Sequence, residues 1–423
     1  MGKVLVTRDY LEDIASAIRE KAGASDTYAP SQMAGAIRGL GKGAEIEILG
    51  RSLTGHYENA GLQAMGDYAL AGCSKLAAVS FPNCRDVAYG AFRDCNRLSE
   101  VYMPMCDVIG PSAFFNCQAL EKISAPACFA ISDYAFANCR ALEAASFPSC
   151  ETVGAYAFQS CSNLETASFP ACTTIGKAAF FDAPAVREAA IPNCRTISET
   201  AFMGCRQLES LYLPYCRTLS FQAFQSCSRL SSIYLPMVTN IGSSCFNSCS
   251  MLKEIDLPSC VTLSMCAFYA CYSLAAANLP ECTSVGTSCF AFCSALEEIS
   301  LPKCIYAGSC AFYGCRSLSE VEMPLTHIGS SCFNSCINLQ QASFSAASSI
   351  YSYAFYGCSQ LRSLYLLGSS VVSLASITAF MSTPISVSTI IGRFGSIFVP
   401  SSLYAKYRTA SVWSLFSDRL VSA

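Results

Sequence analysis

The sequence has few of the residues on which catalytic and metal sites depend. Its 423 residues include only two histidines, His56 and His327, and one tryptophan, and 13% of the residues are charged. It contains no C-x-x-C pair, no zinc signature and no glycine-rich phosphate loop. A general base also needs a partner within reach, so we interpret His327, beside the one shortened repeat, as a surface residue. The sequence therefore predicts no enzyme, no metal site and no cofactor.

A basic stripe and a long apolar run are also missing. The formal net charge is -3 and the pI is about 5.6, which argues against nucleic acid as a partner. The uncharged stretch 363–392 holds eight Ser or Thr residues and Pro384 between Val371 and Ile391. A membrane-spanning helix needs about 20 predominantly apolar residues. No apolar run follows the first positive residue, so we expect no membrane span, no signal peptide and synthesis in the cytoplasm.

The sequence is rich in one feature, a repeat of 22 residues with a single step of 21. Its most regular positions are Phe92, Phe114, Phe136, Phe158, Phe180, Phe202, Phe224, Phe246, Phe268, Phe290, Phe312, Phe333 and Phe355, with Leu70 in the first unit. A fixed period of about 20 to 50 residues is typical of a solenoid, in which each unit buries its apolar face against its neighbours. Such proteins usually act by presenting a surface.

Each repeat contains the pattern of a short strand. Ile255 and Leu257 are apolar, whereas Glu254 and Asp256 alternate with them and should point outward. Pro258 has no N–H to donate and therefore ends the strand. A Gly or Ser four residues before the next Phe is expected to allow a bend. The pattern predicts about 14 stacked units with a parallel β-sheet along one edge.

All 28 cysteines lie within the repeats. Packing, disulfides and metal binding are the three interpretations. Stacked coils place equivalent residues about 4.8 Å apart with parallel side chains, whereas a disulfide needs Cβ atoms about 3.8 Å apart. Cysteine recurs at two positions of the repeat, three residues after the Phe and two residues after the Pro. Ala183 replaces it at the first position, and Val238 and Thr326 replace it at the second, although a disulfide or metal site would lose a partner at each replacement. We favour packing of reduced, buried thiols in a reducing compartment, with disulfides and metal as the alternatives.

The repeat resembles a known family. The pattern A-F-x-x-C-x-x-L-x-x-I-x-L-P-x-C-x-x-I-G-x-x-A-F, seen at Ala223–Phe246 with Val238 replacing one Cys, resembles the BspA-like leucine-rich repeats over about residues 60–366. This resemblance implies an α/β repeat solenoid. It also implies a surface role, because the family is known from bacterial surface adhesins, protist surface proteins and phage tail-associated proteins.

The N-terminal segment differs from the repeats. The run D-Y-L-E-D-I-A-S-A-I-R-E-K-A-G-A-S-D-T-Y-A-P-S-Q-M-A-G-A-I-R-G-L, at Asp9–Leu40, has the pattern of two short helices with Pro30 opening the second. It resembles the helical module on phage and prophage tail-associated proteins of Gram-positive hosts. We therefore predict an attachment module at residues 1–42. The alternative is a helical hairpin that only caps the first coil.

The C-terminal segment also differs from the repeats. Residues 43–366 form the predicted solenoid, and residues 367–423 form a predicted capping region. From Val399 onward the sequence resembles the closing segment of BspA-like chains, in which a strand precedes a helix. Its aromatic residues, including Trp413 and Phe416, are expected to cover the last coil.

Outward-facing aromatic residues are the candidate binding residues. The strand tyrosines are Tyr102, Tyr212, Tyr234 and Tyr365, and the turn aromatics are Tyr269, Phe292 and Tyr313. Tyrosine gives a large contact area at low entropy cost, although the turn aromatics could instead pack over adjacent coils. The acidic residues Glu254, Asp256, Glu298, Glu320 and Glu322 could attract a basic partner, but we interpret them as a solvated face.

These observations predict a non-enzymatic protein that presents a repeat surface to a host cell-surface protein or glycan. The resemblance implies a phage or prophage tail-associated receptor-binding or adhesion protein. It would be located in the virion tail after cytoplasmic synthesis, with other virion proteins as partners of its N-terminal module. The alternatives are a bacterial cell-surface adhesin and a structural virion spacer without a ligand.

Overall fold

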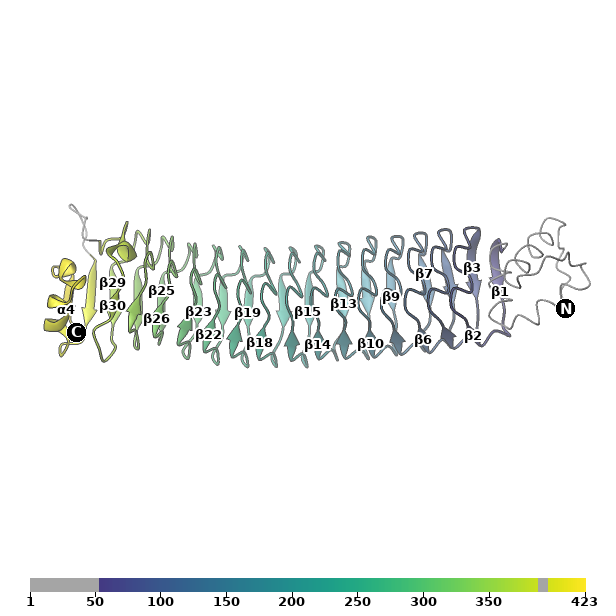
Figure 1. Ribbon diagram of the computed structural model, residues 1–423, viewed down its shortest axis with the longest axis horizontal. Helices are drawn as coiled ribbons and strands as arrows, with labels where there is room; N and C mark the ends of the chain where they lie inside the picture. Colours follow the sequence, from purple (N-terminus) through teal and green to yellow (C-terminus); the bar gives the residue numbers. More distant parts are fainter. Residues whose placement is uncertain (1–52, 387–394) are drawn as a thin grey trace, which may run out of the picture. The chain divides into compact units, whose positions relative to one another are not determined.

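The computed structural model describes residues 53–386 and 395–423. The predicted N-terminal helices at residues 1–42 lie outside the described residues. The chain divides into two compact units, Met1–Ile191 and Pro192–Ala423. In the described part of each unit the backbone winds in successive coils, and each coil contributes one strand to each of two parallel β-layers (Figure 1). The structure thus confirms the predicted solenoid and its parallel sheet, and it adds a second layer of strands.

The strands of the first unit alternate between the two layers. One layer contains β1 (Gly55–Glu58), β3 (Leu76–Ser80), β5 (Glu100–Tyr102), β7 (Lys122–Ser124), β9 (Ala144–Ser146), β11 (Thr166–Ser168) and β13 (Glu188–Ala190). The other contains β2 (Ala64–Met65), β4 (Asp86–Val87), β6 (Val108–Ile109), β8 (Ala130–Ile131), β10 (Thr152–Val153) and β12 (Thr174–Ile175). Strand partners are 22 residues apart, as in the pairing of Thr166 with Ala144. The sequence period therefore equals one coil.

The second unit repeats this arrangement. One layer contains β15 (Ser210–Tyr212), β17 (Ser232–Tyr234), β19 (Glu254–Asp256), β21 (Ala276–Asn278), β23 (Glu298–Ser300), β25 (Glu320–Met323), β27 (Gln341–Phe344), β29 (Ser363–Leu366), β31 (Ser396–Val399) and β32 (Leu420–Ser422). The other contains β14 (Thr196–Ile197), β16 (Thr218–Leu219), β18 (Asn240–Ile241), β20 (Thr262–Leu263), β22 (Ser284–Val285), β24 (Tyr306–Ala307), β26 (His327–Ile328), β28 (Ser349–Ile350) and β30 (Ser373–Leu374). Among the described residues, α-helix is confined to α4 (Tyr404–Thr409), beside the 3₁₀ helices η1 (Ile377–Phe380) and η2 (Trp413–Phe416).

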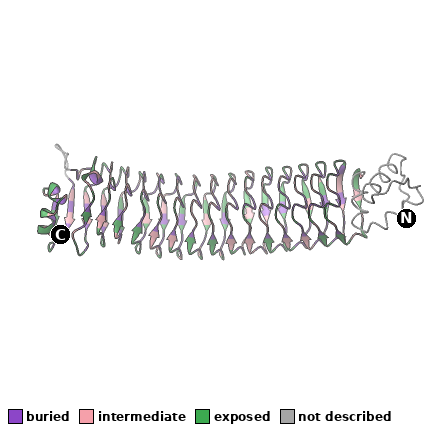
Figure 2. Ribbon diagram, viewed as in Figure 1, coloured by how far each residue is buried: buried purple, intermediate pink, exposed green. Residues whose placement is uncertain are grey.

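The repeated phenylalanines stack along the interior of the coils. In the second unit, Phe246 has no exposed surface, and its ring centroid lies 5.4 Å from that of Phe224 and 5.2 Å from that of Phe268. Both pairs of rings are nearly parallel. The strand residue between two outward ones is buried on strands such as β19 and half-buried on strands such as β17, and Figure 2 shows buried and intermediate residues along the coils by colour. Each coil therefore buries its apolar side chains against the coil before and the coil after it.

The turn that carries each phenylalanine is held by backbone hydrogen bonds to the next coil. Ser244 and Ser248 have positive φ angles of 55° and 63°, a conformation that costs a non-glycine residue free energy. Their N–H groups donate to the carbonyl oxygens of Met265 and Tyr269 at 2.9 and 2.8 Å, and Phe246 N donates to the Ala267 carbonyl at 2.8 Å. Three bonds per coil offset this strain and align successive turns.

The glycines that precede the turn have a different role from the one predicted. Gly242 and Gly286 do not have positive φ angles, so they do not supply an unusual bend. A Cβ atom on Gly242 would instead lie 2.6 Å from the carbonyl carbon of Ser220 in the preceding coil, and one on Gly286 would lie 2.6 Å from Ser264. These glycines allow the close approach of two backbones.

No disulfide joins the 28 cysteines, all of which lie in the described part of the chain, and all are buried except Cys266 and Cys310, which are half-buried. Cysteines three residues after a repeated Phe donate to a backbone carbonyl of the preceding coil, as Cys227 Sγ does to the Phe202 oxygen at 3.1 Å. Cysteines two residues after the Pro of a repeat donate within their own coil, as Cys260 Sγ does to the Thr262 carbonyl at 3.4 Å. This geometry agrees with packing, the interpretation that the sequence favoured.

Thiol titration tests this assignment. Protein prepared without reductant and then denatured with a blocking reagent present should yield close to 28 free thiols, the number in the sequence. The folded protein should react far more slowly, since burial excludes the reagent and raises the thiol pKa. A count below about 20 would require several bridges between coils, which the parallel Cβ vectors disfavour.

The C-terminal residues cover the last coils, as predicted. Tyr407, Trp413 and Phe416 are buried. The Trp413 Nε1–H donates to the Val372 carbonyl at 2.6 Å, and the Val372 N–H donates to the Tyr407 hydroxyl at 3.0 Å. These bonds satisfy backbone groups that no further coil would pair. No helix within residues 53–386 and 395–423 is both long and apolar enough to cross a membrane.

Candidate functional site: a strand face of the second unit

Two exposed tyrosines form a stacked pair on the face of β15 and β17. Parallel pairing aligns Tyr212 with Tyr234. The ring centroids are 5.2 Å apart with an interplanar angle of 6°, and the residues are 62% and 49% exposed. Because the strand register fixes the backbone below both rings, the pair presents a flat aromatic surface with little freedom to rearrange.

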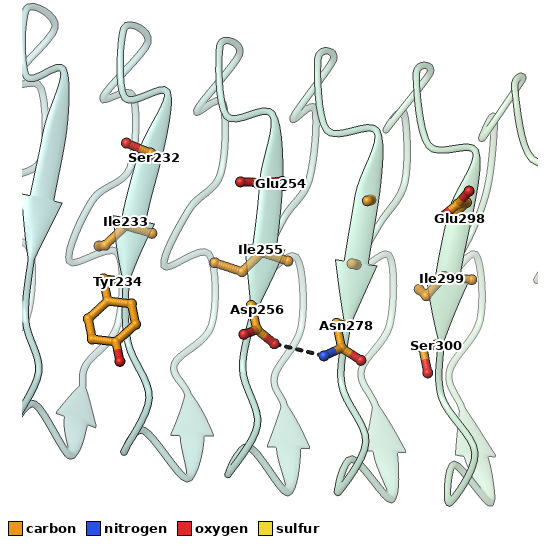
Figure 3. A pocket seen from close by; sticks show the side chains of 12 residues that line it. Ser232, Ile233, Tyr234, Glu254, Ile255, Asp256, Asn278, Glu298, Ile299 and Ser300 are labelled. Atoms are coloured by element: carbon orange, nitrogen blue, oxygen red, sulfur yellow. Dashed lines mark hydrogen bonds between the residues drawn. The ribbon is translucent and has the colours of Figure 1, made fainter.

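A shallow hollow of about 680 Å³ adjoins this pair. It lies over β17, β19, β21 and β23, with Tyr234 on the first strand and Glu298 and Ser300 on the last (Figure 3). The depression forms because β21 carries the short side chain of Ala276 where neighbouring strands carry Glu254 and Glu298. The strand face is therefore concave at this point.

The lining of the hollow is acidic. Glu254, Asp256 and Glu298 contribute carboxylates, and Asn278 Nδ2 donates to Asp256 Oδ1 at 2.8 Å. Glu320 and Glu322 follow on the next strand, β25, where Glu322 lines a second hollow of about 370 Å³. None of the ion pairs of the described residues involves any of these five carboxylates. The five acidic residues, interpreted from the sequence as a solvated face, thus lie in and beside a concave surface.

The other two strand tyrosines occupy different surroundings. Tyr102 is exposed on β5 of the first unit, where its strand neighbours at this position are Ser80 and Ser124. Tyr365 is half-buried, because its ring stacks on Phe398 of β31 at a centroid distance of 4.4 Å. Of the four predicted tyrosines, only Tyr212 and Tyr234 are brought together by the structure.

The turn aromatics pack on one another. Phe292 contacts Tyr269 and Tyr313 edge-on, at centroid distances of 5.5 and 5.2 Å. Tyr269 and Tyr313 are half-buried, and Phe292 is exposed. This arrangement corresponds to packing over adjacent coils, the alternative that the sequence left open, and it still leaves part of each ring accessible.

The structure assigns no acid partner to His327. Its Nδ1 lies 2.7 Å from Ser349 Oγ and 3.3 Å from Ser348 Oγ. Within residues 53–386 and 395–423, no group of three His, Cys, Asp or Glu side chains could hold a metal ion.

Comparisons with known proteins agree with this architecture. The family model described as BspA type leucine-rich repeat region (6 copies) matches residues 53–165, 129–237, 173–297, 217–324 and 283–398. A leucine-rich repeat protein from Bacteroides ovatus ATCC 8483 is similar in fold, with a TM-score of 0.62 and 23% identity over 85% of this chain and 86% of that chain.

A leucine-rich cell surface protein from Faecalibacterium prausnitzii A2-165 is also similar. It is 18% identical over 85% of this chain and 86% of that chain, with a TM-score of 0.33. No curated protein sequence matches the chain. The family model nevertheless covers most of the chain in overlapping segments. The chain therefore belongs to the BspA-type leucine-rich repeat family.

Proposed function

We propose that the chain is a binding protein that contacts a macromolecule through the strand face of β15 to β23 in its second unit. One observation carries this proposal, the stacked pair Tyr212 and Tyr234 beside a concave surface. Exposed aromatic side chains are costly in water unless a partner covers them, and they are enriched at the energetic centres of interfaces. The repeat fold does not require an aromatic side chain at this position, since Asp256, Asn278 and Ser300 occupy the equivalent place on β19, β21 and β23.

The charge of the hollow favours a basic partner. Carboxylates of Glu254, Asp256 and Glu298 without ion-pair partners favour a lysine or arginine side chain from the partner. Tyr234 lies at the edge of the same hollow, where it can contact the aliphatic part of such a side chain or its charge. We therefore favour a protein with basic residues on its surface.

The biological setting follows from the family and from the N-terminal sequence. BspA-type repeats suit binding and surface adhesion. The resemblance of Asp9–Leu40 to a tail-attachment module supports the narrower proposal of a phage or prophage tail protein that recognises a host cell. A bacterial cell-surface adhesin is the second candidate, because the same repeats can serve either setting.

Substituting the tyrosine pair tests the proposal. The double variant Tyr212→Ser and Tyr234→Ser should bind intact host cells at least tenfold less well, because truncating an interface aromatic commonly costs about 2 kcal/mol. Its melting temperature should hardly change, because both side chains are exposed. Cell binding of fluorescently labelled full-length protein measures the first effect, and thermal unfolding followed by circular dichroism measures the second.

A matched control is available in the other layer of the same unit. Tyr306 and Tyr351 are exposed at β24 and after β28, and the variant Tyr306→Ser with Tyr351→Ser should bind as the parent does. Unchanged cell binding by the first variant would contradict the assignment and direct attention to Tyr269, Phe292 and Tyr313. If variants of these residues also bind normally, the chain is better explained as a structural spacer.

A further inference from the structure

A second charged feature of this unit lies in the turns that lead into β14 and β16. Arg195 and Arg217 immediately precede these strands, in successive coils. Arg217 N donates to the Arg195 carbonyl at 2.9 Å, and Thr196 pairs with Thr218 in the adjoining strands. Equivalent residues of adjacent coils are about 4.8 Å apart, so the two guanidinium groups start from neighbouring, in-register backbone positions.

The two arginines line a small hollow together with two apolar side chains. The hollow has a volume of about 260 Å³ and is lined by Arg195, Tyr215, Arg217 and Met237. All four residues are exposed, and Tyr215 is 54% exposed. Two positive charges thus share a hollow with an accessible aromatic ring and a thioether chain.

No acidic side chain of the described residues forms an ion pair with the two arginines of this hollow. In the first unit the same turn position carries Arg85 followed by Asp107, and these two side chains form an ion pair of 3.1 Å. In the second unit the position carries two arginines followed by Thr239. No ion pair of the described residues involves Arg195 or Arg217. Like charges at neighbouring register positions destabilise a sheet, so a bound anion would stabilise this part of the fold.

We propose that this hollow binds an acidic sugar, with its carboxylate or sulfate between Arg195 and Arg217 and its ring against Tyr215. Guanidinium groups match oxyanions because each can donate two parallel N–H bonds. A free anion would leave the exposed ring of Tyr215 and the Met237 side chain uncovered. A sugar acid carries its oxyanion and an apolar ring face on one rigid group, and a hollow of about 260 Å³ holds one such group.

This site is separate from the acidic strand face in position and in ligand chemistry. The hollow at β17 to β23 presents carboxylates that repel an anion, whereas the turn hollow presents arginines that attract one. The proposal does not depend on the function of the tyrosine pair. The two sites can therefore be tested with different ligands and different variants.

Calorimetric titration of the full-length protein tests the site with defined probes. N-acetylneuraminic acid supplies a carboxylate, galactose 6-sulfate supplies a sulfate, and galactose and inorganic sulfate supply each half alone. At least one acidic sugar should bind tenfold or more tightly than galactose or inorganic sulfate. The two acidic sugars distinguish a carboxylate site from a sulfate site. Binding should weaken as salt is raised, because both arginines are exposed.

Variants separate the roles of the lining residues. Arg195→Gln with Arg217→Gln should lose at least tenfold in affinity for the acidic sugar. Tyr215→Ala should weaken the sugar several-fold without changing weak binding of inorganic sulfate. The control Arg206→Gln with Arg229→Gln removes the same charge from exposed positions of this unit and should bind as the parent does.

Four results would overturn the proposal. Inorganic sulfate that binds as tightly as the sugars would show a simple anion site. N-acetylglutamate amide that binds more tightly than either sugar would assign the hollow to an acidic protein. Equal losses in the Arg206 and Arg229 control would show that only net charge matters. Absence of binding by all probes would show that the hollow is not a ligand site.

Discussion

Raising the pH from 7 to 9.5 is expected to destabilise the second unit, because its thiols are buried in the folded state. Burial raises the pKa of Cys216, Cys260 and Cys304 to about 12 each, against an ordinary value of 9.0. Burial, and then the neighbouring cysteines, also raise the pKa values of the Cys227 and Cys249 thiols well above the ordinary value. The folded unit therefore keeps protons that the unfolded chain releases.

The direction of the effect follows from proton linkage. A group whose pKa is raised in the folded state contributes stability that is fully present below its unfolded pKa and is lost as the pH rises towards the folded pKa. At pH 9.5 each thiol with such a raised pKa lowers the free energy of unfolding by about 1 kcal/mol. Cys216, Cys260 and Cys304 alone therefore lower the free energy of unfolding by about 3 kcal/mol, a sizeable part of the stability of a domain.

Thermal unfolding between pH 7 and pH 10, with reductant and without oxygen, measures this effect. The melting temperature should fall steeply above about pH 9. The control is Cys216→Val with Cys260→Val, since the equivalent position between them is naturally Val238. This variant should release about two fewer protons on unfolding and show a shallower fall. A melting temperature that stays level up to pH 10 would contradict the burial of the thiols.

Replacing Phe246 by alanine is expected to lower the free energy of unfolding by about 3–5 kcal/mol, the usual cost of removing a buried ring. Phe246 has no exposed surface and stacks on Phe224 and Phe268. The cavity cannot collapse easily, because the turn on either side is held by hydrogen bonds to the next coil. The loss should therefore lie near the top of this range.

Chemical denaturation of the full-length protein measures the loss, and an exposed phenylalanine of the same unit provides the control. Phe221 is 46% exposed, so Phe221→Ala should cost less than about 1 kcal/mol. If Phe246→Ala were as mild as this control, the stacked rings could not be the main apolar core. Because each coil contacts only its neighbours, the destabilisation should centre on the coils adjoining residue 246.

The sequence by itself determined the repeat and the strand faces. The 22-residue period places equivalent residues one above another, and alternation around Ile255 assigns Glu254 and Asp256 to the outside. Both are local patterns that any coil must satisfy to bury its apolar side. The second layer was not predicted, because strands such as Thr262–Leu263 have two residues and show no alternation. The role of Gly242 was also hidden, since the close approach involves Ser220, in the preceding coil.

The candidate sites depended on the tertiary structure. Tyr212 and Tyr365 have equivalent sequence positions, yet only Tyr212 stays exposed, because β31 brings Phe398 onto Tyr365 from outside the 22-residue period. Two arginines 22 residues apart were visible in the sequence. Whether an acid neutralises them, and whether a hollow opens between their side chains, depends on which neighbouring residues reach the same point in space. Periodicity fixes the backbone positions of a solenoid, whereas its binding surface is set by side chains of different lengths on adjacent coils.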